Sequence, residues 1–168
     1  ELDFSELDGT LHSIGGNAQV GDREWFQSAR SGKPFLSEQL FSKTTQKLIQ
    51  VIAVPIYDNN HQVIGVLSAD IDGFWLSEQI KDIVVGKTGE CYILGLTGTT
   101  IAQKNFELVR SQDNILNNAK TNSDFTSLAT FTQHALEIDK SEVGYYNYKG
   151  DSYIASYATM KTTDWSVI

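Results

Sequence analysis

The stretch from Asp22 to Ala29 reads Asp-Arg-Glu-Trp-Phe-Gln-Ser-Ala and places a guanidinium, an indole and a phenyl ring within one helical turn. Arg23 offers a planar fork of donors that matches a carboxylate. Trp25 carries an indole N–H donor on a large apolar body, and Phe26 adds an apolar wall. These side chains predict a site for a small carboxylate. The alternative is that Trp25 and Phe26 anchor a helix to a sheet while Arg23 pairs with an acidic residue.

A second feature is the pair Asp70 and Asp72, which ends an apolar stretch. Because side chains alternate along a strand, the two carboxylates point to the same face. An acid on the core-facing side of a strand needs a partner, which a ligand ammonium, a helix start or Arg23 can provide. The alternative is that one of the two, Asp72 in preference, caps the following helix.

Other chemistry is not indicated. His12, His61 and His134 lie far apart, and none has a second ligand at metal-site spacing. The run Gly86-Lys87-Thr88 is similar to the end of a phosphate-binding loop, but Lys81 stands where that motif begins with glycine. There is no Gly-x-Ser-x-Gly elbow. The sequence therefore predicts neither catalysis nor a metal or cofactor.

Composition limits the remaining classes. The chain has 168 residues, a formal net charge of −8, 40% hydrophobic and 20% charged residues, as expected for a globular protein. A pI near 4.7 argues against nucleic-acid partners, which need a basic face. Cys91 is the only cysteine, so no disulfide framework forms within the chain. The uncharged apolar runs are much shorter than the ~20 residues of a membrane span.

The elements that position the first-half residues follow from periodicity and turn signals. We expect a helix from Arg23 to Ser31, with Asp22 as its N-cap and Gly32 as its stop. The stretches Leu48–Tyr57 and Val63–Asp72 predict an antiparallel hairpin. Pro55 removes a ladder donor and should fall at an edge or near the strand end. Two further strands are expected at Leu7–Ser13, which contains an Asp-Gly turn, and at Phe35–Phe41.

The second half repeats this pattern after a helix from Phe74 to Val85 and a break at Gly86–Gly89. We expect helical material over 111–137 and strands at Cys91–Leu96, Thr99–Gln103, Gly144–Tyr148, Ser152–Met160 and Trp165–Ile168. The fold class is α+β, with two tandem PAS-like lobes, each an antiparallel sheet flanked by helices. The predicted domains are 1–84 and 85–168.

On these residues the chain resembles the extracytoplasmic double Cache sensor domain of bacterial chemoreceptors, sensor histidine kinases and diguanylate cyclases. The resemblance runs nearly end to end. It is carried by Asp22–Ala29, by the hairpin of Leu48–Pro55 and Val63–Asp72, by Gly86–Thr99, and by the closing stretch Tyr157–Ser166.

The resemblance implies a long N-terminal helix, missing from this segment, and flanking transmembrane helices that tether the domain outside the inner or plasma membrane. It implies a homodimer in the full-length receptor. It places the ligand in the membrane-distal first lobe, where Arg23 and Trp25 bind the carboxylate of an amino acid and Asp70 binds the ammonium. Phe26 stands where tyrosine is common.

Two departures bear on the ligand. Leu40 and Ser42 occupy the positions of a Tyr-x-Asp pair, and the stretch 17–20 lacks a tyrosine. One ammonium partner is thus missing, which favours a small carboxylate or a modified amine over a standard α-amino acid.

The predicted site consists of Arg23, Trp25, Phe26, Ser42 and Asp70. The expected function is ligand sensing in a methyl-accepting chemotaxis receptor, without enzyme activity. The alternatives are a kinase or cyclase sensor, or a module that only dimerises or binds protein.

Overall fold

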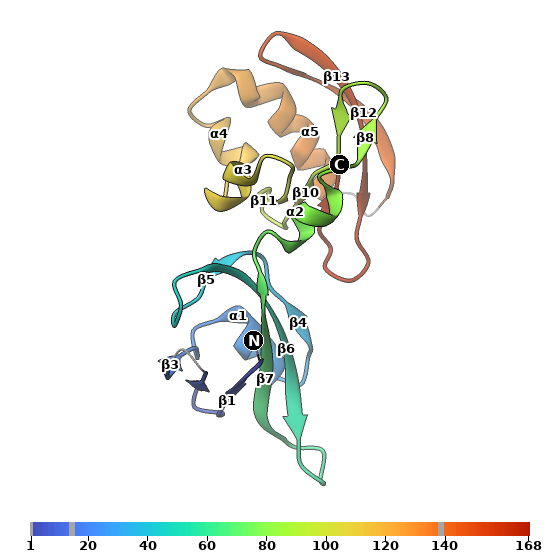
Figure 1. Ribbon diagram of the computed structural model, residues 1–168. Helices are drawn as coiled ribbons and strands as arrows, with labels where there is room; N and C mark the ends of the chain where they lie inside the picture. The colour runs from blue at the N-terminus through green and yellow to red at the C-terminus, as the bar shows by residue number, and fades with distance from the viewer. Residues whose placement is uncertain (1, 14–15, 138–139) are drawn as a thin grey trace. The chain divides into compact units, whose positions relative to one another are not determined.

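The computed structural model describes residues 2–13, 16–137 and 140–168. The chain folds as two compact units, Glu1–Trp75 and Leu76–Ile168, and in each of them helical structure packs against an antiparallel sheet (Figure 1). This confirms the predicted α+β class. The helix α2 (Trp75–Ile80) belongs to the second unit from Leu76 onward, and the domain boundary at 84/85 stays a prediction. There the Ser77 hydroxyl accepts a hydrogen bond from the Gln103 backbone N–H at 3.2 Å.

The first unit contains one antiparallel sheet with a helix, α1 (Glu24–Arg30), across one face (Figure 1). The strand order is β3-β2-β1-β7-β6-β4, and β5 also pairs with β6. The strands are β1 (Leu2–Ser5), β2 (Thr10–His12), β3 (Ala18–Gln19), β4 (Phe35–Leu36), β5 (Leu40–Phe41), β6 (Leu48–Tyr57) and β7 (Val63–Asp72).

The long hairpin of β6 and β7 forms at the predicted residues and occupies the middle of the sheet. Its ladder runs from Ile49 opposite Asp72 to Tyr57 opposite Val63. Pro55 lies near the end of β6, as expected. The neighbouring strand β4 pairs only with Ile52 and Ala53, so Pro55 does not interrupt that ladder.

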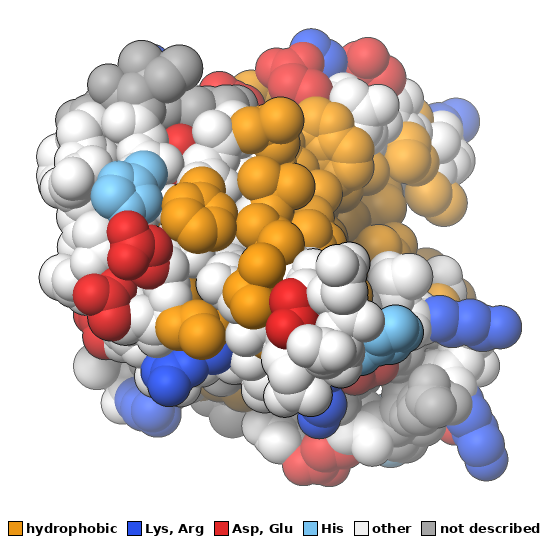
Figure 2. Space-filling view, turned by 90° about the horizontal axis from the view of Figure 1, so that it is seen from below, with side chains coloured by type: hydrophobic (Ala, Val, Ile, Leu, Met, Phe, Trp, Pro, Cys, Tyr) orange, Lys and Arg blue, Asp and Glu red, His pale blue; other side chains and the backbone are white. Residues whose placement is uncertain are grey.

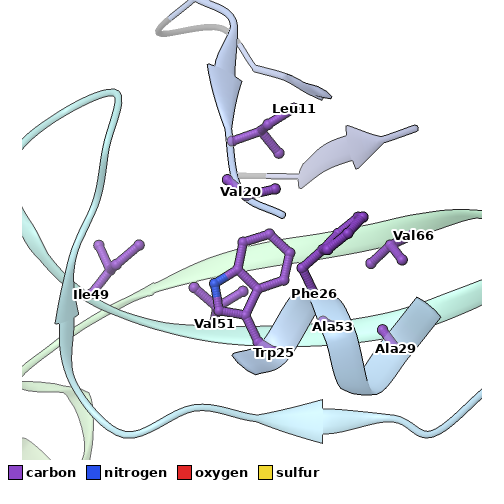
Figure 3. Close-up of a cluster of buried hydrophobic side chains, with 9 residues drawn as sticks. All are labelled: Leu11, Val20, Trp25, Phe26, Ala29, Ile49, Val51, Ala53 and Val66. Carbon is purple, nitrogen blue, oxygen red and sulfur yellow. The ribbon is translucent and has the colours of Figure 1, made fainter. Parts of the chain in front are cut away.

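The core of this unit lies between α1 and the central strands. Three α1 side chains, Trp25, Phe26 and Ala29, are buried against β6 and β7. Figure 3 shows the two aromatic rings above the strands, and the full buried cluster consists of Leu11, Val20, Trp25, Phe26, Ala29, Ile49, Val51, Ala53 and Val66. This spacing of bulky side chains on one helical face therefore attaches α1 to the sheet.

The opposite face of the same sheet is hydrophobic and exposed. Its side chains from β1, β6 and β7 include Leu2, Phe4, Ile52 and Leu67. Hydrophobic side chains form a continuous band on the surface in Figure 2. An apolar sheet face of this kind is typical of a surface that another element or chain covers.

Several local predictions were wrong. The N-cap of α1 is Arg23, without a side-chain cap, because the Asp22 carboxylate binds the Lys43 ammonium instead. The helix α2 ends at Ile80, and Val84–Val85 forms a strand, β8, that pairs with β9 (Gly89–Glu90). Two β-branched residues before a turn favour a hairpin over a helix.

The other two strand predictions in the first unit were too long. Only Thr10–His12 of the expected Leu7–Ser13 strand is extended, following the Asp-Gly turn. The expected Phe35–Phe41 strand is divided into β4 and β5.

The second unit combines a sheet of order β11-β10-β14-β13-β12 with short helices. Its further strands are β10 (Ile93–Leu94), β11 (Thr100–Ala102), β12 (Glu142–Tyr148), β13 (Asp151–Thr159) and β14 (Ser166–Val167). Its further helices are α3 (Phe106–Arg110), α4 (Ile115–Asn118), η1 (Ser123–Phe125) and α5 (Thr126–Glu137).

The core of the second unit lies between α5 and the hairpin of β12 and β13. Phe131 of α5 packs edge-on to Tyr157 and is tilted against Tyr146. A Cβ atom at Gly144 would lie 2.9 Å from the Phe131 ring, so glycine is required for this close approach. Aromatic packing thus attaches α5 to the sheet, as α1 is attached in the first unit.

We predict that Phe26→Ala destabilises the first unit by ~3–5 kcal/mol, because it empties a completely buried site in the α1 cluster. Urea denaturation followed by circular dichroism measures the loss. Phe41→Ala is the matched control: its ring is 47% exposed, and it should cost about 1 kcal/mol or less. Equal losses for the two variants would contradict the packing described for α1.

Candidate functional site

The start of α1 is tied to the segment that follows β5. Arg23 is half-buried as a residue, and its guanidinium donates through Nη2 to the Phe41 carbonyl oxygen at 3.0 Å. Lys43 donates to the Gln19 carbonyl oxygen at 2.7 Å and to the Asp22 carboxylate. Three connections therefore hold residues 19–23 against residues 41–43, and they fix the position of Arg23. The guanidinium has five N–H donors, so one bond to a carbonyl leaves it able to bind an anion.

The Trp25 ring is buried, but its indole nitrogen makes no hydrogen bond. The side chain is 4% exposed, and its Nε1 atom has no hydrogen-bond partner. Its ring meets Phe26 edge-on, with centroids 6.1 Å apart, and Figure 3 shows the indole nitrogen on the side of the ring away from Phe26. An unpaired buried donor costs about 1–3 kcal/mol, so the site favours an acceptor beside this nitrogen.

Asp70 lies on the face of β7 that is turned to α1. It pairs across the ladder with Val51, a member of the Trp25 cluster, and directly opposite side chains share a face. The Asp70 side chain is half-buried. Asp72 points to the same side, but its carboxylate accepts the Phe74 backbone N–H at 2.8 Å, just before α2. Asp72 therefore closes a turn before α2, which leaves Asp70 as the acid of the candidate site, and a helix cap by Asp72 stays a prediction.

Ser42 is buried but already engaged. Its hydroxyl oxygen accepts the backbone N–H groups of Thr44 and Thr45 at 3.3 and 3.2 Å. It also shares a 3.0 Å hydrogen bond with the Thr44 hydroxyl. These bonds close the turn after β5, one residue beyond the carbonyl that Arg23 binds. The visible contribution of Ser42 is to hold this loop, and a ligand contact by Ser42 stays a prediction.

The five predicted residues all belong to the first unit. Trp25 and Phe26 belong to one buried cluster, and Asp70 lies across the ladder from Val51 of that cluster. Arg23 binds the backbone carbonyl of the residue that precedes Ser42. Sequence reasoning missed two further polar residues on this side of the sheet, Asp3 and Ser5, which are 4% and 0% exposed. The sequence signal was the alternation of polar and apolar residues in β1, which by itself does not say which face is inside.

Metal chemistry has no support in the described residues. Over 2–13, 16–137 and 140–168, no group of three or more His, Cys, Asp or Glu side chains is arranged to hold a metal ion. The arrangement at α1 instead offers donors at one end, Arg23 and Trp25, and an acceptor, Asp70, on the strand that α1 covers. Such a set can hold a small molecule that carries both an anionic and a cationic group.

Comparison with known proteins gives a family match. The family model described as a Cache domain, of the double-Cache type, matches residues 5–168. No curated protein sequence is similar enough to this chain to be matched.

Solved structures share the fold. The ligand-binding domain of Mlp24, with asparagine, has a TM-score of 0.65 and 20% identity, covering 99% of this chain and 65% of that one. The ligand-binding domain of PctB, an amino acid chemoreceptor of Pseudomonas aeruginosa PAO1, in complex with L-Arg, has a TM-score of 0.68 and 17% identity. The match covers 99% of this chain and 68% of that one. The extracellular domain of rpHK1S-Z16, described as a histidine kinase, has a TM-score of 0.72 and 16% identity. The match covers 99% of this chain and 68% of that one.

These likenesses establish the fold of the chain. The chain spans 65% of the length of the Mlp24 domain and 68% of the other two.

The ion pair beside the site predicts a pH effect. The hydrogen bond from Lys43 lowers the pKa of Asp22 below its ordinary 3.8. A lowered pKa in the folded state means that the pair stabilises the fold above pH 3.8 and that this contribution is lost as the pH falls through the lowered pKa. In an NMR titration of the carboxyl carbons, the Asp22 pKa should lie below 3.8 and return towards it in Lys43→Ala.

Asp58 is the internal control for that titration. Its pKa is also lowered, by the backbone N–H groups of Gln62 and Asn60, and it should not change in Lys43→Ala. An Asp22 pKa that is the same with and without the Lys43 side chain would contradict the tie between the two segments.

Proposed function

The chain belongs to the Cache domain family, and from this membership and the geometry at α1 we propose that it is the ligand-binding sensor domain of a bacterial transmembrane receptor. A methyl-accepting chemotaxis protein is the receptor class we favour, because PctB, which has the same fold, is an amino acid chemoreceptor. The histidine kinase domain of the same fold supports a sensor kinase as the alternative class, and a diguanylate cyclase is a further one.

The proposed ligand is a small carboxylate or an amino-acid-like molecule, bound in the first lobe, 1–84. The observation that carries this proposal is the buried, unpartnered indole N–H of Trp25, close in sequence to the half-buried Arg23. The ligand carboxylate would accept from both groups, and Phe26 would form an apolar wall. Asp70 would bind the amine of the ligand, and Ser42 would border the anionic end.

The role of such a domain is binding, and we propose no catalytic activity for it. The described residues contain no helix that is both long and apolar enough to cross a bilayer. By the family resemblance we propose that the domain lies outside the inner or plasma membrane, tethered by helices of the full-length receptor, and that the receptor is a homodimer. The second lobe, 85–168, would be the membrane-proximal one.

A second candidate function has its own observation. The hydrophobic face with Leu2, Phe4, Ile52 and Leu67 is exposed by 38–71% per residue and lies opposite α1. Such a face favours a module that dimerises or binds another protein and takes no small ligand. The two functions are separated by asking whether a small molecule binds on the α1 side.

We predict that Arg23→Ala weakens ligand binding at least ~10-fold, because a desolvated carboxylate loses a charge-assisted hydrogen bond. A thermal-shift screen with amino acids, carboxylates and amines would first identify a ligand, since binding to the folded state alone raises the melting temperature. Calorimetric titration with the best compound then compares wild type and Arg23→Ala. The matched control is Arg30→Ala, an exposed arginine in the last turn of the same helix, which should bind as wild type does.

The same titration with Asp70→Ala tests the other end of the site and should also show weakened binding. If Arg23→Ala and Asp70→Ala both bind like wild type, the site assignment is wrong. If the folded wild-type domain binds none of the compounds, the interaction-module function replaces the sensor of small molecules.

A further inference from the structure

The first strand, β1, turns its polar side chains inward and its hydrophobic side chains outward. In β1 the hydrophobic side chains Leu2 and Phe4 are 71% and 39% exposed, whereas Asp3 and Ser5 are 4% and 0% exposed. An ordinary strand on a core turns its hydrophobic side chains inward. Among the buried residues of the described chain, Asp3 is the only one with an acidic or basic side chain. Turning Asp3 inward removes a carboxylate from water, which costs free energy, and local rules of this kind are broken mainly at functional sites.

The neighbouring strand β7 also turns polar side chains to the inner face. Asp3 pairs with Ser68 of β7, and Ser68 is 2% exposed. Asp70 lies two residues further along the same face of β7, so Asp3 and Asp70 are diagonal neighbours. Residues in this relation are typically about 7–8 Å apart, and their Cβ atoms slightly less. On the other side of Asp3, Ser5 pairs with Val66, a member of the Trp25 cluster. A polar strip thus runs beside the hydrophobic cluster that Trp25 and Phe26 cover.

Two buried polar atoms along this strip await a partner. The Ser5 hydroxyl oxygen and the Trp25 indole nitrogen are both buried and make no hydrogen bond. They lie at opposite ends of the strip, because Ser5 pairs with Val66, whereas Trp25 packs with Val51, opposite Asp70. The strip therefore combines its two carboxylates with an unused hydroxyl at one end and an unused N–H donor at the other.

The charges around the strip decide what that molecule must carry. Arg23, at the start of α1, is the cation on the Trp25 side, and its Nη2 atom donates to the Phe41 carbonyl. Lys43 is occupied by Asp22 and by the Gln19 carbonyl oxygen. The strip itself contributes the carboxylates of Asp70 and Asp3. Its far end is therefore acidic, so a molecule bound there is favoured if it carries positive charge at that end.

We infer, resting on the proposed function, that Asp3 and Ser5 are ligand contacts and that Asp3 makes the site selective for a diamino acid. The ligand carboxylate binds Arg23 and Trp25, the α-ammonium binds Asp70, and the second ammonium binds Asp3 and the Ser5 hydroxyl. Asp3 thus provides a second acidic partner from β1, on the side of β7 away from Leu40 and Ser42. Diagonal neighbours of a sheet are separated by about the length of a short alkyl chain, which suits a ligand with an amine at each end.

The test is a comparison of two ligands with the same six-carbon chain by calorimetric titration of the wild-type domain. L-lysine has a second ammonium, whereas L-norleucine ends in a methyl group. L-lysine should bind at least ~10-fold more tightly, the effect expected of one charge-assisted hydrogen bond. Asp3→Asn, which keeps the shape of the side chain and removes its charge, should lower L-lysine affinity about 10-fold. The same variant should leave L-norleucine affinity nearly unchanged.

Controls separate this inference from the proposed function. Asp82→Asn, at an exposed aspartate of the second unit, should change neither affinity. Ser5→Ala should weaken the binding of L-lysine and leave the binding of L-norleucine unchanged. If Asp3→Asn does not fold, the Ser5→Ala variant provides the test in its place.

Equal binding of the two ligands by wild type would overturn the selectivity while leaving the sensor function intact. Binding of neither ligand, nor of any other compound, by the folded wild type would overturn both.

Discussion

The first unit depends on the burial of Trp25 and Phe26 between α1 and the β6–β7 hairpin. The helix has only seven residues, too few to be stable alone, so packing of these two rings against Val51 and Ala53 fixes its place. The same packing removes the indole N–H of Trp25 from water without giving it an acceptor. One side chain thus stabilises the fold by its ring while its nitrogen keeps an unused hydrogen-bond donor.

The sheet beneath α1 has two unlike faces, and their contrast connects fold and function. The face turned to α1 combines the hydrophobic cluster with Asp3, Ser5, Ser68 and Asp70, whereas the opposite face is hydrophobic and exposed. Acidic and hydroxyl side chains are seldom found on the inner face of a sheet, where hydrophobic side chains are the rule. A polar inner face is consistent with a ligand site, and an apolar outer face with a covering element or a second chain.

Sequence reasoning succeeded where a signal was local and strong. The β6–β7 hairpin formed at the predicted residues because two long β-branched stretches flank one turn. Asp22 was wrong as a cap because a distant residue, Lys43, takes its carboxylate. The end of α2 was wrong because Val84 and Val85 pair with β9, a contact that helical periodicity does not reveal. Asp3 was missed because alternation alone does not identify the buried face of a strand.

The central claim, that the unpartnered indole N–H of Trp25 is a ligand donor, can be tested by NMR of 15N-labelled tryptophan. The chain gives three indole signals, assigned by substitution, from Trp25, Trp75 and Trp165. When the best ligand of a thermal-shift screen is added, the Trp25 indole proton should move downfield and become protected from exchange, while the Trp165 signal stays in place. Saturating binding that leaves the Trp25 signal unchanged would contradict the claim.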